Sequence, residues 1–262
     1  MNLDNSTTIY LTSKESKARI KKIPESELLH DSKTESRSIK VDKNLTRQSI
    51  LGFGGAFTEA SASIYDQLET DKKNEIIQAY FGDSGNQYNM GRTHINSCDF
   101  SLGNYALCEQ EDRELTNFSI ERDKKMLIPF IKEALKKASS PILLMASPWS
   151  PPPWMKTNHQ MNHGGKLKEE FQDTWAEYYC KYIEFYERDG IPIWGISVQN
   201  EPEAVQTWDS CIYTGEEERD FIKNFLGPAL KRNKYLDKKL VIWDHNRDVM
   251  VERSRAVLSD PD

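Results

Sequence analysis

The sequence has few cysteines and no closely spaced pair of them. Its four cysteines, Cys98, Cys108, Cys180 and Cys211, are scattered through 262 residues without a C-x-x-C motif. Structural zinc sites and disulfide-rich domains both need regular, close cysteine spacings. The distribution therefore predicts four isolated thiols.

An excess of positive charge is also missing. Lys and Arg number 35 against 41 Asp and Glu, which gives a formal net charge of −6. Because proteins that bind nucleic acid need a positive surface, nucleic acid is not expected as the main partner. No apolar run is long enough to cross a bilayer, so no membrane span is predicted. Residues 1–4 lack the basic and apolar regions of a signal peptide, which leaves the compartment open.

Two common catalytic signatures are missing as well. No G-x-S-x-G motif marks a serine nucleophile. His159 and His163 have H-x-x-x-H spacing, but Gln160 stands where a metalloprotease motif needs glutamate. His94 and His245 are isolated in the sequence. We therefore predict no metal site and no cofactor.

The chain has two regions that differ in composition. Residues 1–45 are polar and rich in Lys and Ser, and the segments Thr8–Thr12 and Ser38–Val41 alternate like short strands. We interpret 1–45 as an amino-terminal segment of a β module. Residues 46–262 form the second predicted domain.

In this second region, apolar segments typical of strands alternate with helical patterns. The predicted strands are Ile50–Phe57, Tyr88–Ile95, Ile142–Trp149, Ile193–Gln199 and Leu240–His245. The intervening helices are predicted from caps at Thr70 or Asp71 and at Ser119, from the aromatic segment Phe171–Tyr186, and from a capping box at Thr214 and Glu217. Such alternation predicts a parallel sheet.

The length of each unit favours a barrel over an open sheet. Repeats of about 40 to 50 residues with an elaborate loop after each strand are typical of a (β/α) barrel. Five strands do not close a barrel of eight. We therefore predict an α/β fold, an incomplete (β/α)8 TIM barrel of about five βα units, belonging to the amino-terminal part of a longer protein. A compact five-stranded α/β domain is the alternative.

The segment Asn200-Glu201-Pro202 follows a buried strand directly. Pro202 cannot donate to a sheet ladder, so the strand ends there and places Glu201 at its carboxyl end. In barrels and open α/β sheets that end carries the chemistry. A carboxylate at such a place is costly unless it is used, which predicts that Glu201 is a functional acid.

Polar and aromatic residues follow the other predicted strands. Arg92 and Asp99 come with the second, Trp149 and Trp154 with the third, and Asp244 with the fifth. Taken singly, Arg92 and Asp99 are equally well explained as a structural ion pair, and the two indoles as a hydrophobic plug. Taken together, carboxylates, an arginine, an amide and exposed indoles at one mouth favour a sugar site.

Four motifs in this order resemble glycoside hydrolase family 30, which includes lysosomal glucosylceramidases and bacterial enzymes acting on β-glucans. They are GFGGAFT at 52–58, SCDFS at 97–101, ASPWSPPPWMKTN at 146–158 and QNEP at 199–202. The similarity extends from about Ser49 to the end of the sequence. It implies a (β/α)8 barrel with an attached β-sandwich, partly built from the amino-terminal segment, and a secreted, periplasmic or lysosomal compartment.

The resemblance also implies roles for single residues in a retaining mechanism. Glu201 matches the acid/base residue, and Asn200 matches the residue that binds the sugar 2-hydroxyl. Asp99 and Trp149 match residues that hold the sugar, and Arg92 matches the arginine that supports the carboxylates. No residue matches the nucleophile, a glutamate after the seventh strand, so we expect the 262-residue chain alone to be inactive.

The resemblance leaves the substrate open. A glucosylceramidase-like β-glucosidase is the leading hypothesis, with β-1,6-glucan or xylan as alternatives in the same family and a carbohydrate-binding pseudoenzyme as the rival from another class. Trp208, in the loop after the fourth strand, either contacts the leaving group or packs on the next helix.

Overall fold

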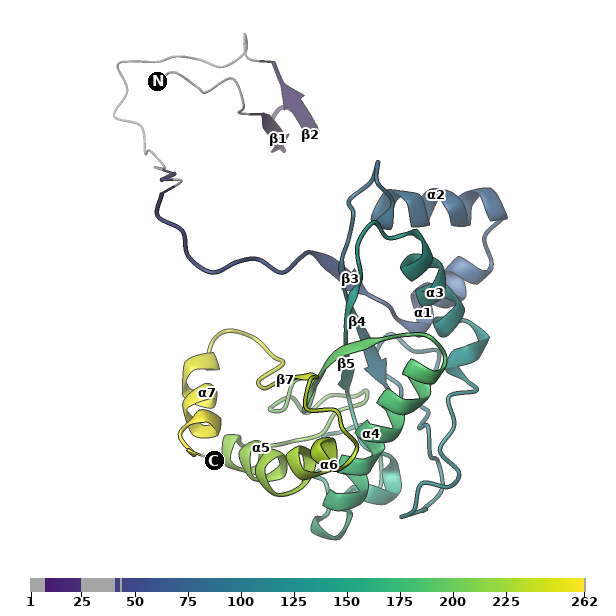
Figure 1. Cartoon of the computed structure of the whole chain (residues 1–262), viewed down its shortest axis with the longest axis vertical. Coiled ribbons are helices and arrows are strands. Elements are labelled where there is room, and N and C mark those ends of the chain that lie inside the picture. Colours follow the sequence, from purple (N-terminus) through teal and green to yellow (C-terminus); the bar gives the residue numbers. More distant parts are fainter. Residues whose placement is uncertain (1–7, 25–40, 43, 262) are drawn as a thin grey trace. The chain divides into compact units, whose positions relative to one another are not determined.

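The computed structural model describes residues 8–24, 41–42 and 44–261 (Figure 1). The chain divides into two compact units, Met1–Ser49 and Ile50–Asp262, and each is considered by itself.

The first unit contains an antiparallel pair of strands, β1 (Ile9–Ser13) and β2 (Ala18–Ile23), in which Ile9 lies opposite Ile23. β1 confirms the predicted strand at Thr8–Thr12, shifted by one residue. β2 was not predicted, because its exposed Arg and Lys side chains hide the alternation. The predicted strand Ser38–Val41 lies outside the described residues except for Val41, which is in no strand. The attached β-sandwich stays a prediction.

The second unit is built on a five-stranded parallel sheet in the order β3-β4-β5-β6-β7, which confirms the predicted parallel sheet. Its strands are β3 (Gly54–Ala56), β4 (Met90–Ile95), β5 (Leu143–Pro148), β6 (Ile193–Ser197) and β7 (Lys239–Val241). Each is shorter than its apolar run, because residues at the ends of the runs leave the ladder to form loops.

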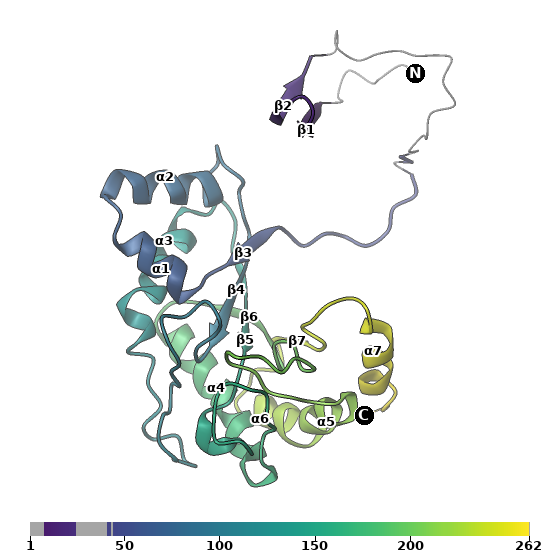
Figure 2. The same ribbon diagram turned by 180° about the vertical axis from the view of Figure 1, so that it is seen from behind.

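Helices connect and cover these strands (Figures 1 and 2). They are α1 (Glu59–Asp66), α2 (Thr70–Phe81), α3 (Leu127–Lys137), α4 (Gln172–Arg188), α5 (Gly215–Phe221), α6 (Gly227–Arg232) and α7 (Met250–Leu258). Short 3₁₀ turns lie at Asp123–Lys125, Pro153–Met155 and Glu169–Phe171, and a π-helical turn, Ile222–Leu226, joins α5 to α6. Figure 2 shows α5 and α7 side by side.

Two predicted helix caps are wrong. α2 begins at Thr70 itself, after Glu69, and no side chain caps it. Ser119 caps no helix, since α3 begins only at Leu127. The capping box at Thr214 is confirmed: its hydroxyl accepts from the Glu217 N–H at 3.1 Å, and Glu217 accepts from the Thr214 N–H at 2.8 Å. α1 was not predicted, because Ser61 takes the place of the usual Glu or Gln in its capping box.

The aromatic helix α4 fixes the loops at the carboxyl end of the sheet. Its fully buried tyrosines bury their rings in the core and keep a hydrogen bond at the hydroxyl, as buried tyrosines generally do. Tyr179 donates to the Val198 carbonyl at 2.5 Å, just before the segment of Asn200. Tyr178 donates to Asn96, directly after β4. Packing in the core therefore also holds the strand ends.

Two neighbouring glycines in β3 offer a test of the sheet packing. A Cβ on Gly54 would lie 1.6 Å from the Met90 carbonyl oxygen, whereas a Cβ on Gly55 would meet nothing within 4 Å. We expect Gly54→Ala to lower the free energy of unfolding by about 1–3 kcal/mol, because the β4 backbone must move. Gly55→Ala serves as the control and should change it by less than about 1 kcal/mol. Urea denaturation followed by circular dichroism measures both, and equal midpoints for the two variants would contradict the close strand approach.

Candidate active site

Arg92 joins four neighbouring strands of the sheet. It lies on β4, and its Nε donates to Ser147 Oγ of β5 at 3.1 Å. One terminal nitrogen donates to Asn200 Oδ1 at 2.8 Å and to Asp244 Oδ2 at 2.7 Å, which follow β6 and β7. Ser147 in turn donates to the same Asp244 oxygen at 2.8 Å. This set, Arg92, Ser147, Asn200 and Asp244, is called the arginine cluster below.

The cluster requires a curved sheet. β4 and β7 are three steps apart in the strand order, which in a flat sheet corresponds to roughly 14 Å at the usual strand spacing. A side chain that leaves β4 perpendicular to a flat sheet would not reach across that distance. The 2.7 Å ion pair between Arg92 and Asp244 therefore shows that the strands curl toward one another. This curvature agrees with the barrel-like arrangement predicted for the sheet.

Trp149 lies beneath the arginine cluster. The guanidinium carbon of Arg92 is 4.5 Å from the centre of its ring, a cation–π contact. Trp149 is only 8% exposed, and the half-buried Trp154 donates to the Cys108 carbonyl at 3.0 Å and packs edge-on against Phe171. The prediction of exposed indoles is thus wrong for Trp149, and the alternative of packed rings describes the loop better. The Pro-rich loop instead packs both rings against neighbouring side chains.

Glu201 is held by its backbone at the carboxyl end of β6. The Glu201 N–H donates to the Asp244 carbonyl at 2.9 Å, and the Asn200 N–H donates to the Pro148 carbonyl at 2.8 Å. Glu201 has a φ of 45°, in the left-handed region that a residue with a side chain seldom adopts. Such backbone strain is common at functional sites. Glu201 as a whole residue is half-buried.

Asp99 lies on the loop that follows β4. The loop closes where the Ser97 N–H donates to the Tyr105 carbonyl at 3.0 Å and the Tyr105 N–H donates to Ser97 Oγ at 2.9 Å. Asp99 itself is exposed. The alternative of an Arg92–Asp99 ion pair is wrong, because the arginine pairs with Asp244. The Asp99 carboxylate is therefore open to solvent.

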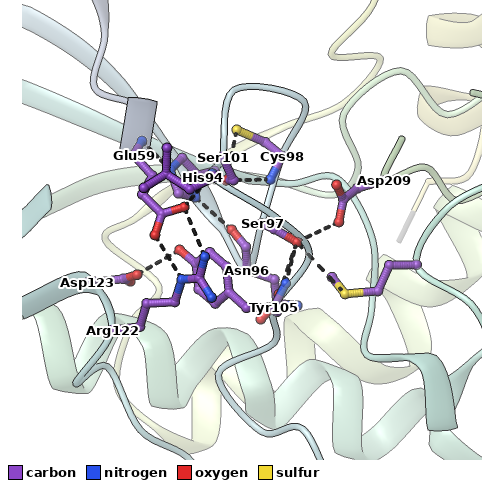
Figure 3. Close-up of polar contacts among 12 residues, drawn as sticks. Glu59, His94, Asn96, Ser97, Cys98, Ser101, Tyr105, Arg122, Asp123 and Asp209 are labelled. Carbon is purple, nitrogen blue, oxygen red and sulfur yellow. Dashed lines mark hydrogen bonds and ion pairs between the residues drawn. The ribbon is translucent and has the colours of Figure 1, made fainter. Parts of the chain in front are cut away.

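A buried carboxylate is hydrogen-bonded to the Asp99 loop (Figure 3). Glu59, at the start of α1, accepts from the Leu102 N–H at 2.8 Å, inside the loop. Arg122 donates to both oxygens of Glu59, at 2.8 and 3.2 Å. The His94 ring completes the support, since its Nε2 accepts from the Glu59 N–H at 3.2 Å. The loop is thus fixed by charge-assisted hydrogen bonds.

Hydrogen bonds decide the ionisation of Glu59. Burial alone would raise the pKa of Glu59, but the hydrogen bonds from Arg122 and the Leu102 N–H hold it below its usual value. Asp123 lies beside this group, where it accepts from the hydroxyls of Tyr105 and Tyr186, each at 2.7 Å. Burial raises the pKa of Asp123 above its ordinary value. Within one hydrogen-bond network, the pKa of Glu59 is therefore lowered and the pKa of Asp123 is raised.

Among the described residues, the histidines belong to no cluster that could hold a metal ion. Both ring nitrogens of the buried His94 are occupied, Nε2 by the Glu59 N–H and Nδ1 by the Asn96 carbonyl at 2.6 Å. His245 Nδ1 accepts from the Asn246 N–H at 2.7 Å. Among the residues that the structure describes, no group of three His, Cys, Asp or Glu side chains could hold a metal ion. All four cysteines are free and buried, as predicted.

Trp208 lies in the loop after β6 and is 39% exposed. The same loop is fixed by the fully buried Lys156, whose Nζ donates to the carbonyls of Ser210 at 2.5 Å and of Met161 at 3.0 Å. Burial lowers the pKa of Lys156 to about 8. The loops that follow β5 and β6 are therefore tied to each other, with Trp208 on their outer side.

Sequence reasoning assigned no role to several residues of the site. Asp244 was named after the fifth predicted strand, but neither it nor Ser147 was given a partner, because the sequence does not show that Arg92 reaches three strands away. Lys156 was part of a motif without a role, and Glu59 directly follows the first motif. Their only sequence signal is a charged residue inside an otherwise apolar or small-residue segment, which is where a buried, paired charge is expected.

The comparisons with known proteins agree with this geometry. The family model described as the glycosyl hydrolase family 30 TIM-barrel domain matches residues 50–262. The chain belongs to glycosyl hydrolase family 30. The sheet of the second unit is accordingly part of a family 30 barrel domain, and a hydrolase is the class of enzyme that this membership supports.

Three relatives from the family show the range of similarity. The lysosomal acid glucosylceramidase of Mus musculus is 39% identical over 225 residues, or 82% of this chain and 44% of the mouse protein. An endo-1,6-beta-D-glucanase of Neurospora crassa is 30% identical over 210 residues, or 77% of this chain and 43% of that protein. The crystal structure of SrfJ from Salmonella typhimurium is 42% identical with a TM-score of 0.79, covering 81% of this chain and 48% of SrfJ. The chain thus spans less than half the length of each. In the part that the structure describes, no helix is long and apolar enough to cross a membrane.

The support of the Asp99 loop has a testable dependence on pH. Because the pKa of Glu59 is lower in the folded state than its usual 4.5, its ion pair is fully stabilising above pH 4.5 and is lost as the pH falls toward the folded-state pKa. We expect Glu59→Gln to lower the free energy of unfolding at pH 7 by about 2 kcal/mol. The difference from the parent protein should shrink steadily below pH 4.5.

Chemical denaturation between pH 3 and 7 measures this effect. Glu114→Gln, a change at an exposed glutamate, is the control and should follow the parent protein at every pH. A Glu59→Gln deficit that stays constant down to the lowest pH would contradict the assigned ion pair.

Proposed function

We propose that this protein is a retaining β-glycosidase, with a glucosylceramidase-like β-glucoside as its substrate, in which Glu201 is the acid/base residue. The observation that carries the proposal is the half-buried residue Glu201, held in a left-handed backbone conformation beside the arginine cluster. Family membership and similarity to a glucosylceramidase support it.

The proposed reaction has two steps. In the first, Glu201 donates its proton to the oxygen of the scissile glycosidic bond while a nucleophilic carboxylate attacks the anomeric carbon. In the second, Glu201 accepts a proton from the water that attacks the glycosyl-enzyme, which releases the sugar with its original configuration. We assign the nucleophile to no residue of this chain. Glu203, Glu216, Glu217 and Glu218 lie on the loop after β6 or in α5, on the same βα unit as Glu201.

The arginine cluster orients the amide of Asn200. Arg92 donates to Asn200 Oδ1, which directs the Nδ2 donor away from the guanidinium. In the proposed complex this N–H₂ group donates to the sugar 2-hydroxyl, a contact that strengthens as the oxocarbenium ion forms. Asp244 neutralises Arg92, so the charge beside the sugar stays balanced. Arg92 is thus a positioning residue for the substrate contact.

Asp99, Trp149 and Trp208 complete the proposed substrate site. The exposed Asp99 carboxylate can accept hydrogen bonds from sugar hydroxyls, and Trp149 supplies a mostly covered apolar surface. Trp208 is proposed to contact the leaving group, since 39% of its surface is open to solvent. A β-1,6-glucan is the second candidate substrate, because a family 30 relative of that specificity matches this chain. The substrate is a glycoside in either case, and the segment 1–45 is proposed to belong to an attached β-sandwich.

The role of Glu201 predicts a particular pattern of activity. In the full-length protein, Glu201→Gln should lower kcat/KM on alkyl β-glucosides roughly 100- to 10,000-fold, the usual range for loss of an acid/base group. On dinitrophenyl β-glucoside, whose leaving group needs no proton, formation of the glycosyl-enzyme should persist and give a burst of phenolate.

A neighbouring glutamate provides the control for this experiment. Glu203→Gln changes an exposed carboxylate two residues away and should retain activity on both substrates. Equal losses on the activated and unactivated substrates would exclude an acid/base role for Glu201. Steady-state and pre-steady-state kinetics provide both measurements.

The stereochemistry of the product tests the retaining mechanism separately. Proton NMR of the full-length protein acting on a β-glucoside should show the β-anomer of glucose first and the α-anomer only later, through mutarotation. The reason is that two successive inversions at the anomeric carbon restore its configuration. Initial release of the α-anomer would exclude the proposed covalent intermediate.

A further inference from the structure

A groove of mixed polarity opens on the carboxyl-end loops, and none of its lining residues belongs to the arginine cluster. It has a volume of about 440 Å³. Its walls come from the loop after β4, through Asn104 and Glu109, and from the loop after β5, through Gln160 and Asn162. The buried Tyr105 is among the residues beneath this polar rim. Nothing in the proposed reaction uses this groove.

The groove is built on a rigid frame. Asn104 Nδ2 donates to Asn162 Oδ1 at 2.6 Å and to Asp209 Oδ1 at 3.1 Å. Ser97 donates to that same Asp209 oxygen at 2.6 Å (Figure 3). Asn162 Nδ2 reaches the Thr207 carbonyl at 2.9 Å and so fastens the groove to the loop that carries Trp208. Three loops are therefore joined before any ligand arrives, which reduces the ordering cost of binding.

Several polar groups on the rim remain available to a ligand. Glu109 and Gln160 are both exposed, and within the described part of the chain neither side chain has a hydrogen-bond partner. Gln160 offers a donor and an acceptor, Glu109 offers acceptors, and Asn104 has its Oδ1 left after its Nδ2 is used. Sugar hydroxyls both donate and accept, so this combination suits them.

The charge of the groove narrows the choice of ligand. Its lining residues, all of them described, include no Lys, Arg or His, and Glu109 adds a negative charge. An anionic ligand such as a phosphate would be repelled. Four lining residues are apolar, Tyr105, Ala106, Pro153 and Met161, and four are polar, Asn104, Glu109, Gln160 and Asn162, so a purely apolar chain would match only half of the lining. A neutral polyhydroxylated ligand fits best.

Hydrogen bonds connect the groove with the loop of Trp208 in the proposed substrate site. Asn162 donates to the carbonyl of Thr207, directly before Trp208, and Asn104 donates to Asp209, directly after it. We propose that the groove binds a further neutral sugar unit of an oligosaccharide whose scissile end lies at Glu201. The proposal rests on the proposed glycosidase function with its second candidate substrate, a β-glucan, and it makes the groove a determinant of specificity for glycans over single glucosides.

Binding to an inactivated protein tests this proposal. In the full-length protein with Glu201→Gln, methyl β-glucoside and the β-1,6- and β-1,4-linked glucose tetrasaccharides are titrated by calorimetry. We expect at least one tetrasaccharide to bind more tightly than the monoglucoside. Adding Glu109→Ala and Gln160→Ala should weaken that tetrasaccharide about tenfold, since two hydrogen bonds are lost, and leave the monoglucoside unchanged.

The controls separate this proposal from the proposed function. Glu114→Ala, an exposed glutamate outside the groove, should not affect binding, and single Gln160→Ala should give an intermediate loss. Equal affinity for mono- and tetrasaccharide in the Glu201→Gln protein would overturn the proposal. So would an unchanged tetrasaccharide affinity in the double variant, or an equal loss for the monoglucoside. The role of Glu201 is decided independently by the kinetics of Glu201→Gln, so the two can fail separately.

Discussion

The ion pair between Arg92 and Asp244 is the constraint on which the rest of the site depends. It closes the distance between strands that are three steps apart, and in doing so fixes the curvature of the sheet where the loops emerge. Asn200 is oriented by the same guanidinium, and Glu201 is tied to the Asp244 backbone. A single charge pair thus links the shape of the sheet to the direction of the proposed catalytic groups. Partly buried pairs with several hydrogen bonds are suited to such positioning, even when they add little net stability.

Around this centre, the structure is organised as a set of fastened loops. Glu59 with Arg122 holds the loop of Asp99, Lys156 holds the loops after β5 and β6, and the tyrosines of α4 hold the strand ends from the core. Each fastening uses a buried polar or charged group whose hydrogen bonds are directed at backbone atoms of a loop. Loops at the carboxyl ends of strands can therefore present exposed side chains, such as Asp99 and Trp208, from fixed positions. Rigid support of this kind is what preorganised binding requires.

The sequence predicted the parallel sheet well and the side-chain network poorly, for physical reasons. Apolar runs such as Ile193–Gln199 carry the strand signal themselves, but the strand end predicted at Pro202 is wrong, since β6 ends at Ser197. The capping box at Thr214 is equally local, and it was confirmed. By contrast, the partner of Arg92 lies 152 residues away, and only the curvature of the sheet selects Asp244 over Asp99. The burial of Trp149 was missed for the same reason, since exposure depends on which distant side chain covers a ring. Helix starts failed where the cap is made by the backbone alone, as at Glu69.

The left-handed backbone at Glu201 has a consequence for how this position can vary. Glycine adopts a φ of 45° without steric conflict, whereas glutamate does so at a cost of order 1–3 kcal/mol. Glycine would therefore be the least strained residue at position 201, but it has no side chain that could transfer a proton. If Glu201 has the proposed acid/base role, selection for stability and selection for proton transfer act in opposite directions on this residue. The residue at position 201 is therefore informative. A relative in which this position has no catalytic role could replace the glutamate with glycine and lose the strain, whereas a relative that retains glutamate keeps a strained residue.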